Sequence, residues 1–122
     1  MKDIVLSLTL SLIPMSAFAE SFAPVHDEAT FRSLVAGKEL RNALYGVRLN
    51  VLGDGHIEGA AIGRAISGSW SWQGGYFCRA MEWGNTQIPY NCQLVEVRNG
   101  NVLRFTVDQG SGDSASFRLR DN

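Results

Sequence analysis

The residues best suited to acid–base or metal chemistry gather at the start of one predicted strand. His56 and Glu58 are two residues apart, so a strand places both side chains on one face, and Asp54 lies in the turn before them. An imidazole and carboxylates within reach of one another could bind a metal ion or act as an acid/base pair. The alternative is that these side chains are ordinary solvated polar groups at the edge of a hairpin. With His26 as the only other histidine, this site is a weak candidate.

Four arginines form a second candidate site, for an anion. Arg104 and Arg118 lie on the solvent faces of two consecutive predicted strands, and Arg48 and Arg120 belong to similar alternating segments. If these strands pair in register, their guanidinium groups form an anion-binding stripe. The alternative is that they are solubilising charges that protect strand edges.

Arg79 alternates with the large apolar residues of segment 77–83, so it faces either the interior or an aromatic outer surface. In the interior it would need a carboxylate partner such as Glu82, Glu96 or Asp108, because an unpaired buried charge is costly. On the outside, the same face would be unusually rich in large side chains, which often marks an interaction site.

The segment from Trp83 to Tyr90, WGNTQIPY, is predicted to be a connection with more large apolar groups than solubility favours. Its members Trp83, Ile88, Pro89 and Tyr90 are therefore, together with Arg79, the candidate binding residues.

Strands must position most of these side chains. The segment HDEATFRSLVAG predicts one short amphipathic helix, with a cap at His26 or Asp27 and a stop at Gly37. Alternating apolar residues and tight turns follow, which predicts an all-β fold: a small antiparallel up-and-down barrel or strongly curled sheet of about seven or eight strands. The less regular strands are expected at about His56 to Ala65, Ser67 to Gln73, Gly75 to Trp83 and Tyr90 to Arg98.

The glycines of GAAIGRAISG resemble the phosphate-binding loop of dihydrodipicolinate reductases through Gly59, Ala60, Gly63 and Arg64. A dinucleotide loop, however, leads into a helix whose amino end faces the pyrophosphate, whereas this segment leads into SGSWSWQGGYF, which is turn and strand. We interpret the small residues as architecture instead, because they let large neighbours such as the following tryptophans approach in a narrow barrel.

The amino-terminal residues MKDIVLSLTLSLIPMSAFA have the layout of a secretory signal peptide cleaved after Ala19. Residues 20–122 then form a single domain that is periplasmic or secreted. The chain carries 11 basic and 12 acidic residues, so it lacks the basic excess typical of nucleic-acid binding. No further long apolar run follows, and we expect no membrane insertion after cleavage.

Export to an oxidising compartment makes a disulfide between Cys78 and Cys92 the default expectation for the only two cysteines. Neither the four ligands nor the spacing of a structural zinc site is present. No cofactor is expected.

The runs SGSWSWQGGYFCRAMEWG, NCQLV and LRFTVDQGSGDSASFRLR resemble a group of small, exported, largely uncharacterised proteins of alphaproteobacteria. Its members share a W-x-W-x-x-G-Y-F-C-R segment, a second cysteine and a glycine-rich last hairpin, and some carry the dihydrodipicolinate reductase label. The resemblance implies secretion and a disulfide, and it supplies no catalytic residues.

We therefore predict an exported, non-enzymatic binding module for a protein or a small ligand, a class that includes inhibitors of secreted enzymes. The alternatives are a small hydrolase that uses His56 and Glu58, the improbable reductase, and a structural component of the envelope.

Overall fold

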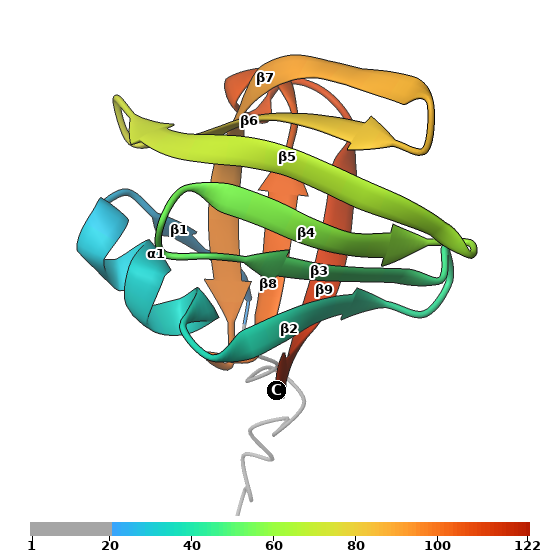
Figure 1. Cartoon of the computed structure of the whole chain (residues 1–122). Coiled ribbons are helices and arrows are strands. Elements are labelled where there is room, and N and C mark those ends of the chain that lie inside the picture. Colours follow the sequence, from blue (N-terminus) through green and yellow to red (C-terminus); the bar gives the residue numbers. More distant parts are fainter. Residues whose placement is uncertain (1–20) are drawn as a thin grey trace, which may run out of the picture.

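Antiparallel strands joined by short turns account for most of the chain (Figure 1). The computed structural model describes residues 21–122, and the predicted signal peptide lies outside the described residues. The strands are β1 (Ala23–Val25), β2 (Lys38–Asn42), β3 (Val47–Val51), β4 (His56–Ala61), β5 (Arg64–Gln73), β6 (Tyr76–Trp83), β7 (Thr86–Arg98), β8 (Val102–Thr106) and β9 (Ser114–Asp121). The helix α1 spans Glu28–Val35, and a short 3-10 turn spans Asp108–Gly110.

Eight of these strands close into an antiparallel barrel in the order β7-β6-β5-β4-β3-β2-β9-β8, with β8 pairing back to β7. The long strand β7 makes this closure, because its first part pairs with β6 and its second part with β8. Strand β1 lies outside the barrel and pairs with the second part of β7. The predicted small up-and-down β-barrel with one short helix is thus confirmed.

The topology places alternate connections at the same end of the barrel. The β2–β3, β4–β5, β6–β7 and β8–β9 connections share one end, which we call the open end. The β3–β4, β5–β6 and β7–β8 turns lie at the other end, together with α1 (Figure 1).

The predicted strand from His56 to Ala65 is wrong, because it is two strands separated by a tight turn at Ile62–Gly63. Both turn residues have positive φ, 49° at Ile62 and 74° at Gly63. Two-residue turns of this kind normally use Asn, Asp or Gly at the first position, whereas isoleucine is a strand former. The sequence therefore gave no turn signal at Ile62.

The predicted loop from Trp83 to Tyr90 is also wrong. Trp83 pairs with Thr86 across a two-residue turn, and the rest of the segment belongs to β7. Pro89 argued against a strand because it cannot donate to a ladder. The structure accommodates it at an irregularity of the β6–β7 pairing between Arg79 and Met81.

The segment GAAIGRAISG forms the β4–β5 hairpin, and β6 rather than a helix follows it. Gly59 faces the barrel interior opposite Ile66. A Cβ atom at Gly59 would lie 2.0 Å from the Arg48 carbonyl oxygen, and one at Gly68 would lie 2.3 Å from that of Ala80. These glycines are architectural, but they allow neighbouring backbones to approach and not the tryptophan side chains that were predicted.

Helix α1 begins at the N-cap Asp27, whose carboxylate accepts a hydrogen bond from the Thr30 amide at 2.9 Å. This hydrogen bond lowers the pKa of Asp27. The helix is attached to the β3–β4 turn through Arg32, which donates to the Gly53 carbonyl oxygen at 2.8 Å and lies over the Trp70 ring.

The helix closes its end of the barrel with an aromatic side chain. Phe31 is fully buried, and its ring centroid lies 5.0 to 5.5 Å from those of Trp70, Trp72 and Phe77. Aromatic pairs at these separations stabilise a core beyond the area that they bury. The barrel is therefore plugged at the helix end.

Candidate functional site

A cavity of about 270 Å³ lies inside the barrel. Its lining is mainly apolar and comes from β2, β3, β4, β6, β7, β8, β9 and the β8–β9 connection. The apolar lining residues are Leu40, Leu49, Val51, Ile57, Phe77, Met81, Phe105, Val107, Ala115 and Phe117, and the polar ones are Arg79, Gln93, Asp113 and Ser114. Of the polar ones, Asp113 and Ser114 are exposed, so the cavity reaches solvent at the open end.

Arg79 is the most unusual residue of this lining. Its register partner on β5 is Trp70, and the residue is only 8 % exposed. Its side chain therefore lies in the interior, as one of the two predictions for segment 77–83 required. Burial lowers the pKa of Arg79, yet a guanidinium group keeps its charge at neutral pH.

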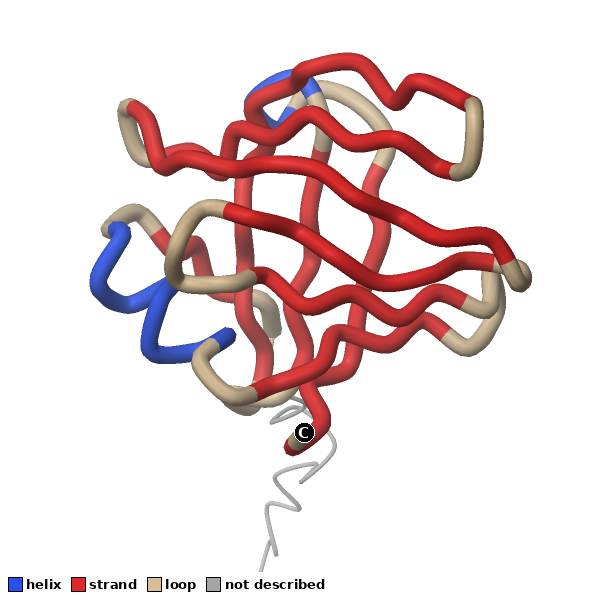
Figure 2. The backbone as a smooth tube through the Cα atoms, viewed as in Figure 1, coloured by secondary structure: helices blue, strands red, loops and turns tan. Residues whose placement is uncertain are grey.

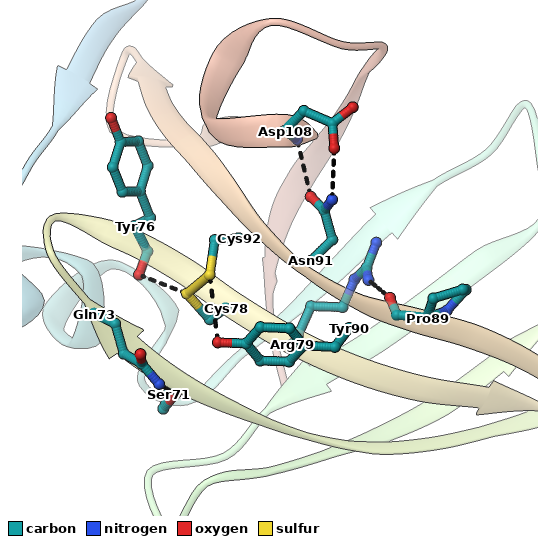
Figure 3. The surroundings of a disulfide bond; sticks show 10 residues. All are labelled: Ser71, Gln73, Tyr76, Cys78, Arg79, Pro89, Tyr90, Asn91, Cys92 and Asp108. Carbon is teal, nitrogen blue, oxygen red and sulfur yellow. Dashed lines mark hydrogen bonds between the residues drawn. A yellow bond between two sulfur atoms is a disulfide. The ribbon is translucent and has the colours of Figure 1, made fainter.

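The irregularity of β7 positions this guanidinium group. Between the pairs Arg79–Asn91 and Met81–Ile88, β7 carries Pro89 and Tyr90 opposite a single residue of β6. The Pro89 carbonyl oxygen accepts a hydrogen bond from Arg79 Nη1 at 2.7 Å (Figure 3). Proline, which interrupts the ladder, thus supplies the acceptor that fixes the arginine.

Arg79 lacks the carboxylate partner that was predicted for a buried position. The ion pairs within residues 21–122 do not include it. Each proposed partner is engaged elsewhere: Glu82 accepts from Gln87 at 2.9 Å, Glu96 pairs with Arg104 at 2.9 Å, and Asp108 accepts from Asn91 at 2.8 Å. The prediction of a carboxylate partner was therefore wrong: among residues 21–122 Arg79 makes no ion pair, and the only acidic residue of the cavity lining is the exposed Asp113 at the open end.

Gln93 is the second buried polar residue of the cavity, and sequence reasoning missed it. It is 7 % exposed and pairs with Phe77, so it is a diagonal neighbour of Arg79 on the inner face. No hydrogen bond of its side chain is found within the described chain. Its position opposite Phe77, next to a cysteine, carried no sequence signal before the register of β6 and β7 was known.

The predicted disulfide between Cys78 and Cys92 is present, and its two residues are register partners on β6 and β7. The cysteines are the sequence neighbours of Arg79 and Gln93, so the bond fastens β6 and β7 next to both positions. Figure 3 shows the bond together with Arg79. The Tyr90 hydroxyl lies 3.4 Å from Cys92 Sγ. The disulfide therefore fixes the spacing of the two polar residues.

Side-chain hydrogen bonds also hold the β8–β9 connection at the cavity mouth. Asn91 donates to the Asp108 carboxylate at 2.8 Å and accepts from the Asp108 amide at 2.9 Å. The hydroxyl groups of Thr106 and Ser114 lie 2.7 Å apart. Thr106, the third buried polar residue of the described chain, is thereby paired, in contrast to Gln93.

The chain matches no family model, no curated protein and no solved structure. Within the part of the chain that the structure describes, no helix is long and apolar enough to cross a membrane.

The acid–base candidate lies on the exposed surface. Asp54 Oδ2 is 3.0 Å from His56 Nδ1, and both side chains are more than half exposed. Hydrogen bonding to Asp54, its negative charge and that of Glu58 raise the pKa of His56, and the contact with His56 lowers the pKa of Asp54. Among residues 21–122, no three His, Cys, Asp or Glu side chains lie close enough to hold a metal ion.

The arginine candidates are only partly brought together. Arg104 pairs with Glu96 at 2.9 Å and lies over the Phe22 ring, so it is not a free member of a stripe. Arg118 and Arg48 both pair in register with Arg41, which sequence reasoning missed. Arg120 lies opposite Glu39.

The other candidate binding residues are spread over the β6–β7 hairpin. Trp83 donates from Nε1 to the Ala61 carbonyl oxygen at 2.7 Å, and Arg64 lies over its ring. Ile88 is half-buried, whereas Pro89 and Tyr90 are exposed. Of the five candidate binding residues, only Arg79 lines the cavity.

Proposed function

We propose that this protein is a non-enzymatic binding protein that takes a small amphipathic anion into the barrel. The apolar part of the ligand would fill the cavity, and its anionic group, a carboxylate or a group of similar geometry, would bind Arg79. The observation that carries this proposal is the buried Arg79, whose guanidinium group faces a mainly apolar cavity and has no carboxylate partner among residues 21–122.

The Arg79 guanidinium group makes no ion pair with the side chains of residues 21–122. A buried charge without a partner is strongly unfavourable, and an ionised group that accepts its hydrogen bonds removes this penalty. Arginine binds carboxylates through two parallel hydrogen bonds, which supplies specificity as well as affinity. The Gln93 amide, on the same inner face, offers a further donor to the same group.

The cavity limits the ligand in size and shape. Its volume of about 270 Å³ is just below the ~300–1,000 Å³ that is typical of small-molecule sites. Aliphatic and aromatic side chains dominate the lining, so the body of the ligand should be apolar. A short-chain or medium-chain aliphatic acid fits both requirements.

The test compares octanoate with octanol, which have the same chain length and differ in charge. Isothermal titration calorimetry on the disulfide-bonded protein should show one octanoate bound per chain, at least about tenfold more tightly than octanol, because hydrogen bonds to charged groups are worth ~1.5–3 kcal/mol.

The variant Arg79→Met should lose this preference for octanoate and retain the binding of octanol. The variant Arg48→Met, at an exposed arginine on the outer face, is the matched control and should leave both affinities unchanged. Equal affinity of the natural protein for both compounds, or no binding of either, would refute the proposal.

A further inference from the structure

Exposed apolar side chains gather at two neighbouring turns of the open end. Of the four large hydrophobic residues that are most exposed, Leu44 (83 %) and Tyr45 (58 %) lie in the β2–β3 turn and Ile62 (68 %) in the β4–β5 turn. The Ile62 amide donates to the Gly46 carbonyl oxygen at 3.3 Å, so the two turns are in contact. Figure 2 shows both turns at the same end. We call Leu44, Tyr45 and Ile62 the turn patch.

Ile62 is unfavourable for the isolated protein in two ways. Its φ of 49° is a left-handed conformation that β-branched residues rarely adopt, and its side chain is largely exposed to water. Asparagine or glycine would suit the turn better and would be soluble. Strained and exposed apolar residues are most readily explained by contact with something outside the fold.

Arginines lie directly beneath the turn patch. Arg48, Arg41 and Arg118 are register partners across β3, β2 and β9, so three like charges stand opposite one another on the outer face. Only Arg41 has a carboxylate partner within the described residues, Glu39 at 2.6 Å. Like charges directly opposite destabilise a sheet, and an external anionic surface would offset this repulsion.

The charge distribution favours one orientation of the protein, in which the turn patch faces an anionic surface. Residues 40–53 and 59–81, which include both turns, carry arginines and no acidic residue, and the acidic residues of strands β2 to β5 are Glu39 and Glu58. The acidic residues Asp27, Glu28 and Asp54 lie at the helix end, and Asp108 and Asp113 lie in the β8–β9 connection. The turn patch thus combines apolar tips with a mainly basic surround, in which Glu39 is paired with Arg41.

We propose that the turn patch docks the protein on an anionic lipid bilayer. Leu44, Tyr45 and Ile62 would enter the interface between headgroups and acyl chains, and the arginines beneath them would contact the anionic headgroups. Aromatic and aliphatic tips combined with basic residues are the usual means of peripheral attachment. The attachment is interfacial and does not span the bilayer.

The test uses the disulfide-bonded protein and sedimentation with two kinds of vesicle, phosphatidylcholine alone and phosphatidylcholine mixed with phosphatidylglycerol. The protein should sediment with the mixed vesicles and much less with the neutral ones, and added salt should weaken the binding. Failure to sediment with the mixed vesicles at low ionic strength would overturn the proposal.

The variant Ile62→Asn separates docking from folding. Asparagine suits the turn, so the melting temperature should stay the same or rise, while the affinity for mixed vesicles should fall about tenfold through the loss of an apolar anchor. Arg48→Ser should lower the affinity about fivefold.

Two further variants serve as controls. Tyr90→Ser removes an exposed aromatic residue from the barrel wall, and Arg79→Met removes the charge of the cavity; both should leave vesicle binding unchanged. Because Arg79→Met removes the preference for an anionic ligand and leaves the turn patch intact, failure of the docking proposal and failure of the ligand proposal remain distinguishable.

Two results would contradict docking on lipid. One is vesicle binding that Ile62→Asn does not alter. The other is a natural protein that forms a dimer in analytical ultracentrifugation and becomes monomeric in Ile62→Asn, which would make the turn patch a contact between two copies.

Discussion

Replacing Arg79 by methionine should stabilise the protein while abolishing its preference for an anionic ligand. Methionine retains an unbranched apolar stem of similar length and removes the charge. The residue is only 8 % exposed, and within the described residues its guanidinium group has one hydrogen bond and no ion pair. An ion in such a site carries an effective penalty of several kcal/mol.

The loss of the hydrogen bond to Pro89 limits the increase in the free energy of unfolding that Arg79→Met can bring. A hydrogen bond to a charged group contributes ~1.5–3 kcal/mol, but Pro89 is exposed, so water can replace Arg79 at its carbonyl oxygen. The net expectation is a free energy of unfolding that rises by about 1–2 kcal/mol. For a domain of this size, the melting temperature should rise by at least ~4 °C.

Urea unfolding and thermal unfolding followed by circular dichroism at neutral pH would measure both quantities. Arg79→Lys retains the charge and should not stabilise the protein, which separates charge from size. A clear loss of stability in Arg79→Met, comparable to that of an ordinary buried hydrogen-bonded residue, would show that the arginine is structural and would refute the reasoning.

Three further predictions concern the strands around the site. Replacing both cysteines by serine, which opens a loop with a sequence separation of 14, should lower the free energy of unfolding by ~3 kcal/mol and weaken octanoate binding, both measurable by urea titration and calorimetry. The pKa of His56, followed by NMR, should exceed its ordinary 6.5 and should fall in Asp54→Asn. The contact between His56 and Asp54 stabilises the fold fully below the ordinary pKa of His56, and this stabilisation is lost as pH rises through the raised pKa of the folded state. On the acid side it is lost as pH falls through the lowered pKa of Asp54. An unshifted midpoint would exclude the contact in solution. Gly59→Ala should lower the free energy of unfolding by at least ~2 kcal/mol, because the new Cβ atom would lie 2.0 Å from the Arg48 carbonyl oxygen. Gly53→Ala is the control and should change the free energy of unfolding by less than ~1 kcal/mol, because the nearest atom to its Cβ is the flexible end of the Arg32 side chain at 3.7 Å.

Local patterns were enough to predict the architecture. The cap and stop of α1, the alternating strands and the pair of cysteines each depend on residues close in sequence or on a single pairing, and all are present in the structure. The two wrong boundaries share one cause. Ile62 stands where turn chemistry predicts asparagine, and Pro89 lies within a strand where it predicts a break. Both residues are exceptions to local preference.

The site was harder to predict than the fold because it depends on register. Sequence alternation indicated that Arg79 shares a face with Phe77, but it could not show which face is internal. That Glu82, Glu96 and Asp108 are all engaged elsewhere follows from two different strand pairings and from the contact of the β8–β9 connection with β7. Gln93 likewise becomes a site residue only once it is placed opposite Phe77.

The plug formed by Phe31 determines where a ligand can come from. With one end of the barrel filled by the helix and its wall closed by β7, exchange must pass through the open end. The same end carries the turn patch. A protein docked there would hold its entrance close to the acyl chains, and a sparingly soluble acid could partition from bilayer to barrel without first dissolving in water. Under those conditions, loading would follow the composition of the bilayer more closely than the concentration of free ligand.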